Sequence, residues 1–175
     1  MTTKKIAMII APDGFRDEEY FEPKEYFENQ GYEVVTFSMK GTQIANGKLG
    51  GTAQVDDNIY NINEKDFDAL VFSGGPGAKI FMGNEYVNKI IEEFYNVNKP
   101  VAAICISPVI LAYSGILKGK NATVFTDDGM AAHTIEREGA NFTPQEIEVE
   151  GNIITGNGPA VATDFAKEIV KKLEN

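Results

Sequence analysis

The sequence predicts an α/β protein in which a mostly parallel sheet carries helices on both faces. Short unbroken apolar runs alternate along the chain with segments of helical period, which is typical of strands buried on both sides. The 175 residues, 43% of them hydrophobic, suffice for one well-packed core and are few for two. There are no repeats, low-complexity tracts or linkers, so residues 1–175 are expected to form a single domain.

Six segments are predicted as strands of this sheet. They are Lys5–Ala11, Glu33–Phe37, Ala69–Ser73, Val101–Ile104, Glu146–Glu150 and Asn152–Thr155. The last two are joined at Gly151, which favours a hairpin. Residues Gly41–Asn63, rich in Gly and Asn with weak alternation around Thr52–Val55, predict a second hairpin outside the main sheet.

Helices are predicted where apolar residues recur at helical spacing. The segment Tyr86–Asn96 and the C-terminal segment from about Val161 each carry an apolar stripe along one face. Residues Asp17–Gln30 form another helix, which ends at Gly31 as a C-terminal cap. Pro23 inside that helix predicts either a kink or a later start.

Composition and charge restrict the compartment and the partners. A single cysteine cannot form an intramolecular disulfide, and the N-terminus has no apolar stretch long enough for a signal peptide, so a cytoplasmic location is expected. No apolar run approaches the roughly 18 residues of a membrane span, so no membrane association is expected. The net charge of −10 opposes binding to nucleic acid or to anionic lipid.

No cofactor and no metal ion are expected. Asp13, Asp17, Glu18 and Glu19 follow the first predicted strand, where they would repel the phosphate of a flavin nucleotide. A phospho-acceptor domain needs an aspartate at the end of the third strand, where this chain has Ser73. One histidine, one cysteine and no closely spaced ligand set give little basis for a metal site.

Cys105 is the most informative residue of the chain. It lies between the predicted strand Val101–Ile104 and a new helix that begins around Pro108. A sharp strand-to-helix turn holds a nucleophile clear of the backbone, and the N-terminus of the next helix favours the thiolate. The turn therefore predicts a thiol pKa below the ordinary value of about 8.5. The alternative on spacing alone is a small buried residue at a strand end.

Two more segments end at the same edge of the predicted sheet, where open α/β sheets bind ligands. The first strand leads to Glu19, and the third leads to the glycine-rich turn Gly74–Gly77. Backbone N–H groups of Gly75 and Ala78 are candidate oxyanion donors facing the thiol. The alternatives are a turn that needs glycine only for its backbone angles, and an acid that only complements the helix dipole.

Four ordered motifs resemble the PfpI-like superfamily, which includes the intracellular cysteine peptidases of that name, the parkinsonism-associated deglycase, and related glyoxalases and redox-regulated chaperones. The motifs are Glu19 with Pro23, Gly74–Gly77, Ala102–Pro108 and Thr155–Pro159, and they cover nearly the whole chain. The resemblance implies a flavodoxin-like three-layer sandwich of the class I glutamine amidotransferase type. It also implies that Cys105 is the nucleophile, that Glu19 hydrogen-bonds its sulfur, and that Gly75 is a backbone donor.

The residues that assist the cysteine in this superfamily are incomplete in this chain. The peptidase branch carries a histidine directly after the cysteine and usually a glycine next, where this chain has Ile106 and Ser107. The parkinsonism-associated branch carries a histidine after the following strand, where Asp127 and Asp128 are candidate replacements. The same branch has an arginine near the late Gly-Pro turn, where this chain has Asn157.

The resemblance places a carboxyl group beside a thiol. Two buried anions would repel each other, so Glu19 is expected to stay protonated with a raised pKa and to donate a hydrogen bond to the Cys105 sulfur. The two groups should therefore share one proton. Such a pair suits attack on a small electrophile, and it also suits oxidation by peroxide.

Three functions remain open. The first is cysteine-dependent stress-response chemistry on small reactive carbonyls, of the glyoxalase or deglycase type. The second is a non-catalytic redox sensor or holdase chaperone in which Cys105 is the oxidisable group. The third, a peptidase or amidase, is disfavoured because Ile106 cannot act as a base, and because His133 falls in a predicted surface helix at Asp128–Glu138. A homodimer or larger homo-oligomer is expected from the resemblance.

Overall fold

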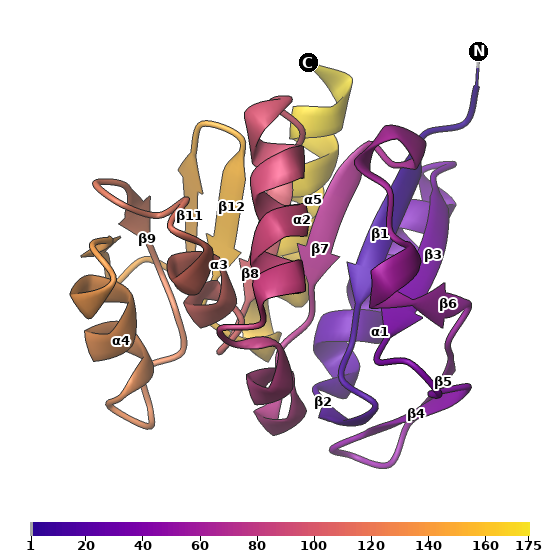
Figure 1. Ribbon diagram of the computed structural model, residues 1–175, viewed down its shortest axis with the longest axis horizontal. Helices are drawn as coiled ribbons and strands as arrows, with labels where there is room; N and C mark the ends of the chain where they lie inside the picture. The colour runs from indigo at the N-terminus through magenta and orange to yellow at the C-terminus, as the bar shows by residue number, and fades with distance from the viewer. Residues whose placement is uncertain (1) are drawn as a thin grey trace.

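The computed structural model, which describes residues 2–175, has a seven-stranded sheet at its centre (Figure 1). Its strands are β1 (Lys5–Ile9), β3 (Glu33–Ser38), β6 (Asp57–Asn58), β7 (Ala69–Phe72), β8 (Val101–Ile104), β11 (Ile147–Glu150) and β12 (Ile153–Gly156). The order is β11-β12-β8-β7-β1-β3-β6, and every neighbouring pair is parallel except β11 with β12. The predicted fold class is confirmed, as is the hairpin at Gly151.

Helices cover both faces of the sheet. They are α1 (Asp17–Asn29), α2 (Glu85–Asn96), α3 (Pro108–Ser114), α4 (Ala131–Arg137) and α5 (Ala162–Glu174). Helices α1 and α5 pack together on one face, and α2 and α3 pack together on the other (Figure 1). Within residues 2–175, no helix combines the length and apolarity that crossing a bilayer would require.

The central strands are apolar because both of their faces are covered. Every residue of β7 and β8 is buried, and β8 contains only Val101, Ala102, Ala103 and Ile104. A four-residue strand buried on both sides has no polar residues to mark its face, so it reads as one unbroken apolar run. Its position between β7 and β12 places Cys105 at the middle of the carboxyl edge of the sheet.

Smaller elements connect the main strands and helices. Strands β2 (Asp13–Phe15), β4 (Ile44–Gly47) and β5 (Thr52–Gln54) form a three-stranded sheet, and β9 (Asn121–Ala122) pairs with β10 (Asn141–Phe142). The 3-10 helices found within residues 2–175 are η1 (Ile59–Asn61), η2 (Glu64–Asp66), η3 (Pro76–Phe81) and η4 (Pro159–Val161). The antiparallel β4–β5 pair confirms the second predicted hairpin.

Helix α1 begins at Asp17, so the expectation of a later start is wrong. Proline has no backbone N–H, and Pro23 therefore leaves the carbonyl oxygen of Glu19, four residues earlier, without its helical donor. The hydroxyl of Ser73 donates to that oxygen at 3.1 Å. A side chain from the end of β7 thus replaces the missing helical hydrogen bond, and it ties Glu19 to the sheet.

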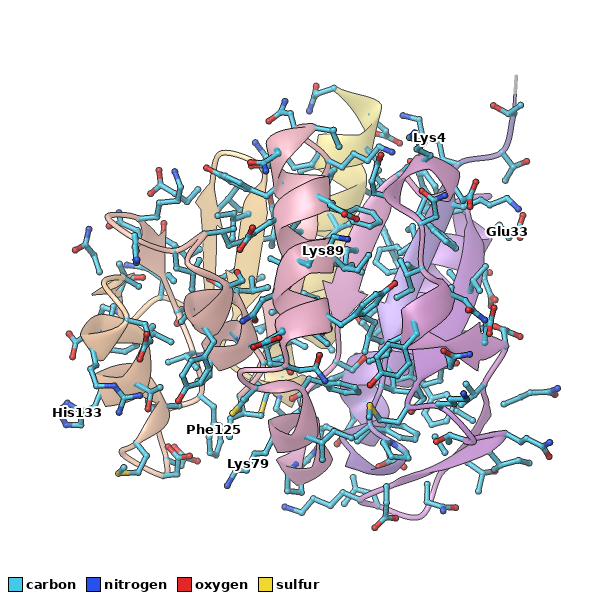
Figure 2. All side chains as sticks on the ribbon, viewed as in Figure 1. Lys4, Glu33, Lys79, Lys89, Phe125 and His133 are labelled. Atoms are coloured by element: carbon cyan, nitrogen blue, oxygen red, sulfur yellow. The ribbon has the colours of Figure 1, made fainter. Side chains whose placement is uncertain are left out.

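Helix α4 is shorter than the sequence predicts. It begins at Ala131 rather than Asp128, because the Asp128 carboxylate accepts hydrogen bonds from the backbone N–H groups of Met130 and Ala131 at 2.9 and 3.1 Å. Aspartate commonly holds a turn in this way, and the turn at Asp128 comes before the N-cap residue of α4, Met130. His133 lies on this helix as expected, with its side chain 82% exposed (Figure 2).

Candidate active site

Cys105 lies in a turn that few residue types adopt. Its φ is 63°, in the left-handed region, where a residue other than glycine is strained unless its surroundings hold it. The Cys105 N–H donates to Gly156 O at 2.9 Å, and its carbonyl oxygen accepts from Phe125 N–H at 2.8 Å. Helix α3 starts three residues later at Pro108. The strand-to-helix turn predicted at Cys105 is present.

Glu19 reaches this turn from α1 and is fully buried. Its Oε2 accepts a hydrogen bond from Gly74 N–H at 2.9 Å. A Cβ at Gly74 would lie 2.4 Å from Glu19 Oε2 and 2.5 Å from Cys105 Cβ, so only a glycine here allows the carboxyl and the thiol to lie so close together. The other oxygen, Oε1, is buried and has no hydrogen-bond partner among residues 2–175.

Burial controls the acidity of both groups. It raises the pKa of Glu19 to about 7, outweighing the contacts with Cys105 and the Gly74 amide that lower it. Burial and then the negative charge of Glu19 raise the pKa of Cys105 to about 12. The prediction of a thiol pKa below 8.5 is therefore wrong, because the thiol is almost entirely buried and faces an acid. Between about pH 7 and 12 the pair holds one proton.

Two backbone amides, those of Gly75 and Ile106, interact with the Cys105 sulfur and lower its pKa. Gly75 has a φ of 97°, and a Cβ there would lie 2.4 Å from Arg16 N, so the position requires glycine. The sequence suggested Ala78 as the second donor, but the second amide that interacts with the sulfur is that of Ile106. The Ala78 N–H is already bonded to Gly75 O at 3.1 Å inside the turn of η3.

Two buried serines connect the segments that carry the carboxyl and the thiol. Ser73 Oγ donates to Glu19 O at 3.1 Å, and Ser107 Oγ donates to Ser73 O at 2.7 Å. The chain of contacts therefore runs from α1 through the end of β7 to the turn at Cys105. Sequence reasoning did not assign this role to either serine. The signal available was Pro23, which leaves the carbonyl oxygen of Glu19 free to accept.

We expect Ser73→Ala to lower the free energy of unfolding by about 1–3 kcal/mol, because it leaves the buried Glu19 carbonyl oxygen without a donor. Urea denaturation measures the change. Thr163→Ala is the control, since it removes an exposed hydrogen bond to Glu22 and should cost no more than about 0.5 kcal/mol. Equal effects of the two substitutions would show that Ser73 does not support α1.

A cavity of about 460 Å³ opens over Cys105. Its apolar walls come from Pro76, Ile106, Phe125 and Pro159, and its charged groups are Arg16, Lys48, Lys79, Asp127 and Asp128. Figure 2 shows Lys79 and Phe125 side by side at the end of the molecule where the cavity lies. Asp127 and Asp128 line the same cavity as Cys105, and their role as replacements for the histidine stays a prediction. Asn157 does not line this cavity, and its N–H is bonded to Glu146 O at 2.9 Å.

The three basic residues of the cavity were not predicted. Arg16 lies just before α1 and pairs with Glu18, its Nε 2.8 Å from Glu18 Oε2, so Glu18 is more than a first-turn acid. Lys48 comes from the β4–β5 hairpin and Lys79 from η3. Nothing in the local sequence around Lys48 or Lys79 indicates that they line the cavity with Cys105. Their positions depend on how the β2–β4–β5 sheet and η3 pack against the main sheet.

Comparison with known proteins supports one family over nearly the whole chain. Residues 4–172 match the model of the DJ-1/PfpI family. The chain is 42% identical to an uncharacterized protein of Methanocaldococcus jannaschii, MJ0967, covering 99% of this chain and 84% of that one. It is 33% identical to the deglycase TK1284 of Thermococcus kodakarensis, covering 95% and 98% of the two chains.

Solved structures give the same result. The crystal structure of a ThiJ/PfpI domain protein from Brachyspira murdochii superposes with a TM-score of 0.92 at 33% identity, covering 99% of this chain and 98% of that one. The sequence motifs, the turn at Cys105 and these similarities agree. The chain belongs to the DJ-1/PfpI family.

Proposed function

We propose that this protein converts small 2-oxoaldehydes into 2-hydroxy acids, with Cys105 as nucleophile and Glu19 as a proton shuttle. One observation carries the proposal. A buried carboxyl group with a pKa of about 7 lies beside the only thiol, and that thiol lines a cavity that a small molecule fits. A carboxyl group whose pKa is close to neutral pH can both donate and accept a proton during turnover.

The first step is addition to the aldehyde. The proton shared by the pair moves to Glu19, and the Cys105 sulfur forms a bond to the aldehyde carbon. The aldehyde oxygen then takes the proton from Glu19, which gives a neutral hemithioacetal and a carboxylate. The Gly75 and Ile106 amides, which face the sulfur, stabilise the thiolate before attack.

The second step moves a proton between the two substrate carbons. The Glu19 carboxylate removes the hydrogen of the former aldehyde carbon as a proton and passes it to the ketone oxygen, which gives an enediol. Glu19 then takes the hydroxyl proton of the first carbon and delivers it to the second carbon. The first carbon is oxidised to a thioester and the second is reduced to an alcohol, so no external oxidant is needed. Water then cleaves the thioester, which releases the 2-hydroxy acid and regenerates the thiol of Cys105.

Peptide hydrolysis fits this site poorly. A thiol peptidase needs a side chain that first accepts the thiol proton and then donates a proton to the leaving amine. Ile106 can do neither, and it occupies the position that the resemblance assigns to a histidine. His133 is the single histidine of the chain, and its exposed ring faces Glu136 on α4, away from the cavity. A 33% identical relative that is named a deglycase supports carbonyl chemistry instead.

The test is incubation with methylglyoxal, following its loss and the formation of lactate. Wild type is expected to form lactate, and Cys105→Ser is expected to lower kcat/KM by at least about 10³-fold. An unstructured peptide serves as a second substrate, on which no cysteine-dependent cleavage is expected. Lactate formation at equal rates by wild type and Cys105→Ser would reject the proposal.

A redox sensor is the second candidate, and the same buried acid favours it. Cys105 is 8% exposed, which admits a peroxide, and a protonated Glu19 would donate a strong hydrogen bond to a sulfinate. Wild type should then stop at the sulfinic acid in graded peroxide, while Glu19→Leu accumulates less of it, as intact mass would show. Identical mass profiles for both proteins would remove this candidate.

A further inference from the structure

Three basic side chains line the cavity over Cys105 in a chain whose net charge is −10, and the chemistry above uses none of them. Arg16 is paired with Glu18. Lys48 and Lys79 form no salt bridge with any residue in the described range 2–175, so their charges are available to a ligand. A small neutral carbonyl compound does not account for this placement.

Lys48 is held at the cavity by its own loop. The carboxylate of Asp17, at the start of α1, accepts hydrogen bonds from Leu49 N–H at 2.8 Å and from Gly51 N–H at 2.7 Å. Lys48 N–H donates to Phe15 O at 2.8 Å. A Cβ at Gly51 would lie 2.4 Å from Asp17 Oδ1, so the loop closes tightly around this carboxylate. These contacts fix the backbone that presents Lys48.

The charges are unevenly distributed around the cavity. Lys48 comes from the β4–β5 hairpin, whereas Asp127 and Asp128 come from the segment before α4, and in Figure 1 the hairpin and α4 lie on opposite sides of the molecule. Arg16 and Glu18 cancel, and Lys48 and Lys79 balance Asp127 and Asp128. A pocket that is neutral overall but divided in this way favours a single negative charge on the Lys48 side over a dianion.

We propose that the preferred substrate is a 2-oxoaldehyde that carries a carboxylate at its far end, bound by Lys48. This inference rests on the proposed function and specifies its substrate class. The reaction stays balanced as before: one water is added, the aldehyde carbon becomes a carboxylate, the ketone becomes an alcohol and one proton is released. The distal carboxylate takes no part in bond making and only orients the aldehyde toward the sulfur.

The charge preference can be measured without turnover, by alkylation of Cys105. Iodoacetate and iodoacetamide have nearly the same shape, and both form an S–C bond with loss of iodide, but only iodoacetate is anionic. We expect the ratio of their rate constants to be about three- to tenfold higher for the protein than for N-acetylcysteine. Lys48→Met should abolish that excess, while Lys89→Met, which removes a lysine on α2 far from the cavity (Figure 2), should leave it unchanged.

The substitution Asp17→Asn distinguishes the effect of the position of Lys48 from the effect of the net charge near the cavity. Removing a negative charge would raise the iodoacetate preference if charge alone mattered. We expect the preference to fall instead, because the loop that presents Lys48 loses its strong acceptor. A rise in Asp17→Asn would show that the loop does not position Lys48.

Turnover gives the final comparison. For 4,5-dioxopentanoate, kcat/KM should exceed that for its neutral methyl ester by about tenfold, and Lys48→Met should remove the difference. If the enzyme turns over methylglyoxal, and if kcat/KM is equal for 4,5-dioxopentanoate and its methyl ester, the substrate class is overturned and the proposed function stays intact. Absence of turnover on every 2-oxoaldehyde, with the alkylation preference present, would instead reject the proposed function and its substrate class, and would leave only the anion preference of the cavity at Lys48.

Discussion

Glu19→Gln is expected to lower kcat/KM for methylglyoxal by about 10²- to 10⁴-fold. Glutamine keeps the shape of the side chain but can neither give nor take a proton, so both the addition and the carbon-to-carbon transfer lose their shuttle. The rate constant for lactate formation, measured across pH, gives the effect. The wild-type profile should also change near pH 7, where Glu19 titrates, and the variant profile should not.

A matched control comes from the same helix. Glu22 is exposed on α1 and its carboxylate accepts a hydrogen bond from Thr163, so Glu22→Gln should leave turnover within about twofold of wild type. Activity of Glu19→Gln within tenfold of wild type would show that another group moves the proton. Asp127 and Asp128 would then be the next residues to replace.

The second large effect is on stability as a function of pH. Burial raises the pKa of Glu19 from 4.5 to about 7, so the folded protein binds this proton more tightly than the unfolded chain does. Its contribution is fully present below about pH 4.5 and is lost as pH rises through 7. The shift corresponds to about 3 kcal/mol, at about 1.4 kcal/mol per pKa unit.

The measurement is the difference in the free energy of unfolding between Glu19→Gln and wild type, by urea denaturation at pH 4 and pH 8. The variant lacks this titration. Its free energy of unfolding relative to wild type should therefore be about 3 kcal/mol higher at pH 8 than at pH 4. Titration of other carboxyl groups cancels in the difference. A difference that stays constant with pH would mean that Glu19 ionises at the same pH in the folded and unfolded states.

The sequence predicts the sheet well where the strands are buried on both faces. Strand β8 has the predicted bounds, and β7 ends one residue early, because a continuous apolar run leaves no choice of face. Strands β2 and β6 are not predicted. They have three and two residues, several of them polar, such as Asp13 and Asp57, and they pair only because neighbouring strands present free edges.

The candidate site divides in the same way. Cys105, Glu19 and Gly75 could be found because each follows a strand or turn with a recognisable local pattern. Lys48 could not, because its approach depends on the Asp17 contacts with a hairpin more than 30 residues away. The sign of the Cys105 pKa shift also depends on tertiary structure: the local turn favours the thiolate, and burial beside an acid outweighs it.

The most direct measurement is the ¹³C NMR titration of the Glu19 side-chain carboxyl carbon, assigned by its absence in Glu19→Gln. If Glu19 and Cys105 share one proton, the midpoint lies at about 7. It moves higher in Cys105→Ala, because contact with Cys105 lowers the pKa of Glu19. A midpoint near the ordinary value of 4.5, unchanged in Cys105→Ala, would contradict the coupled pair and the chemistry built on it.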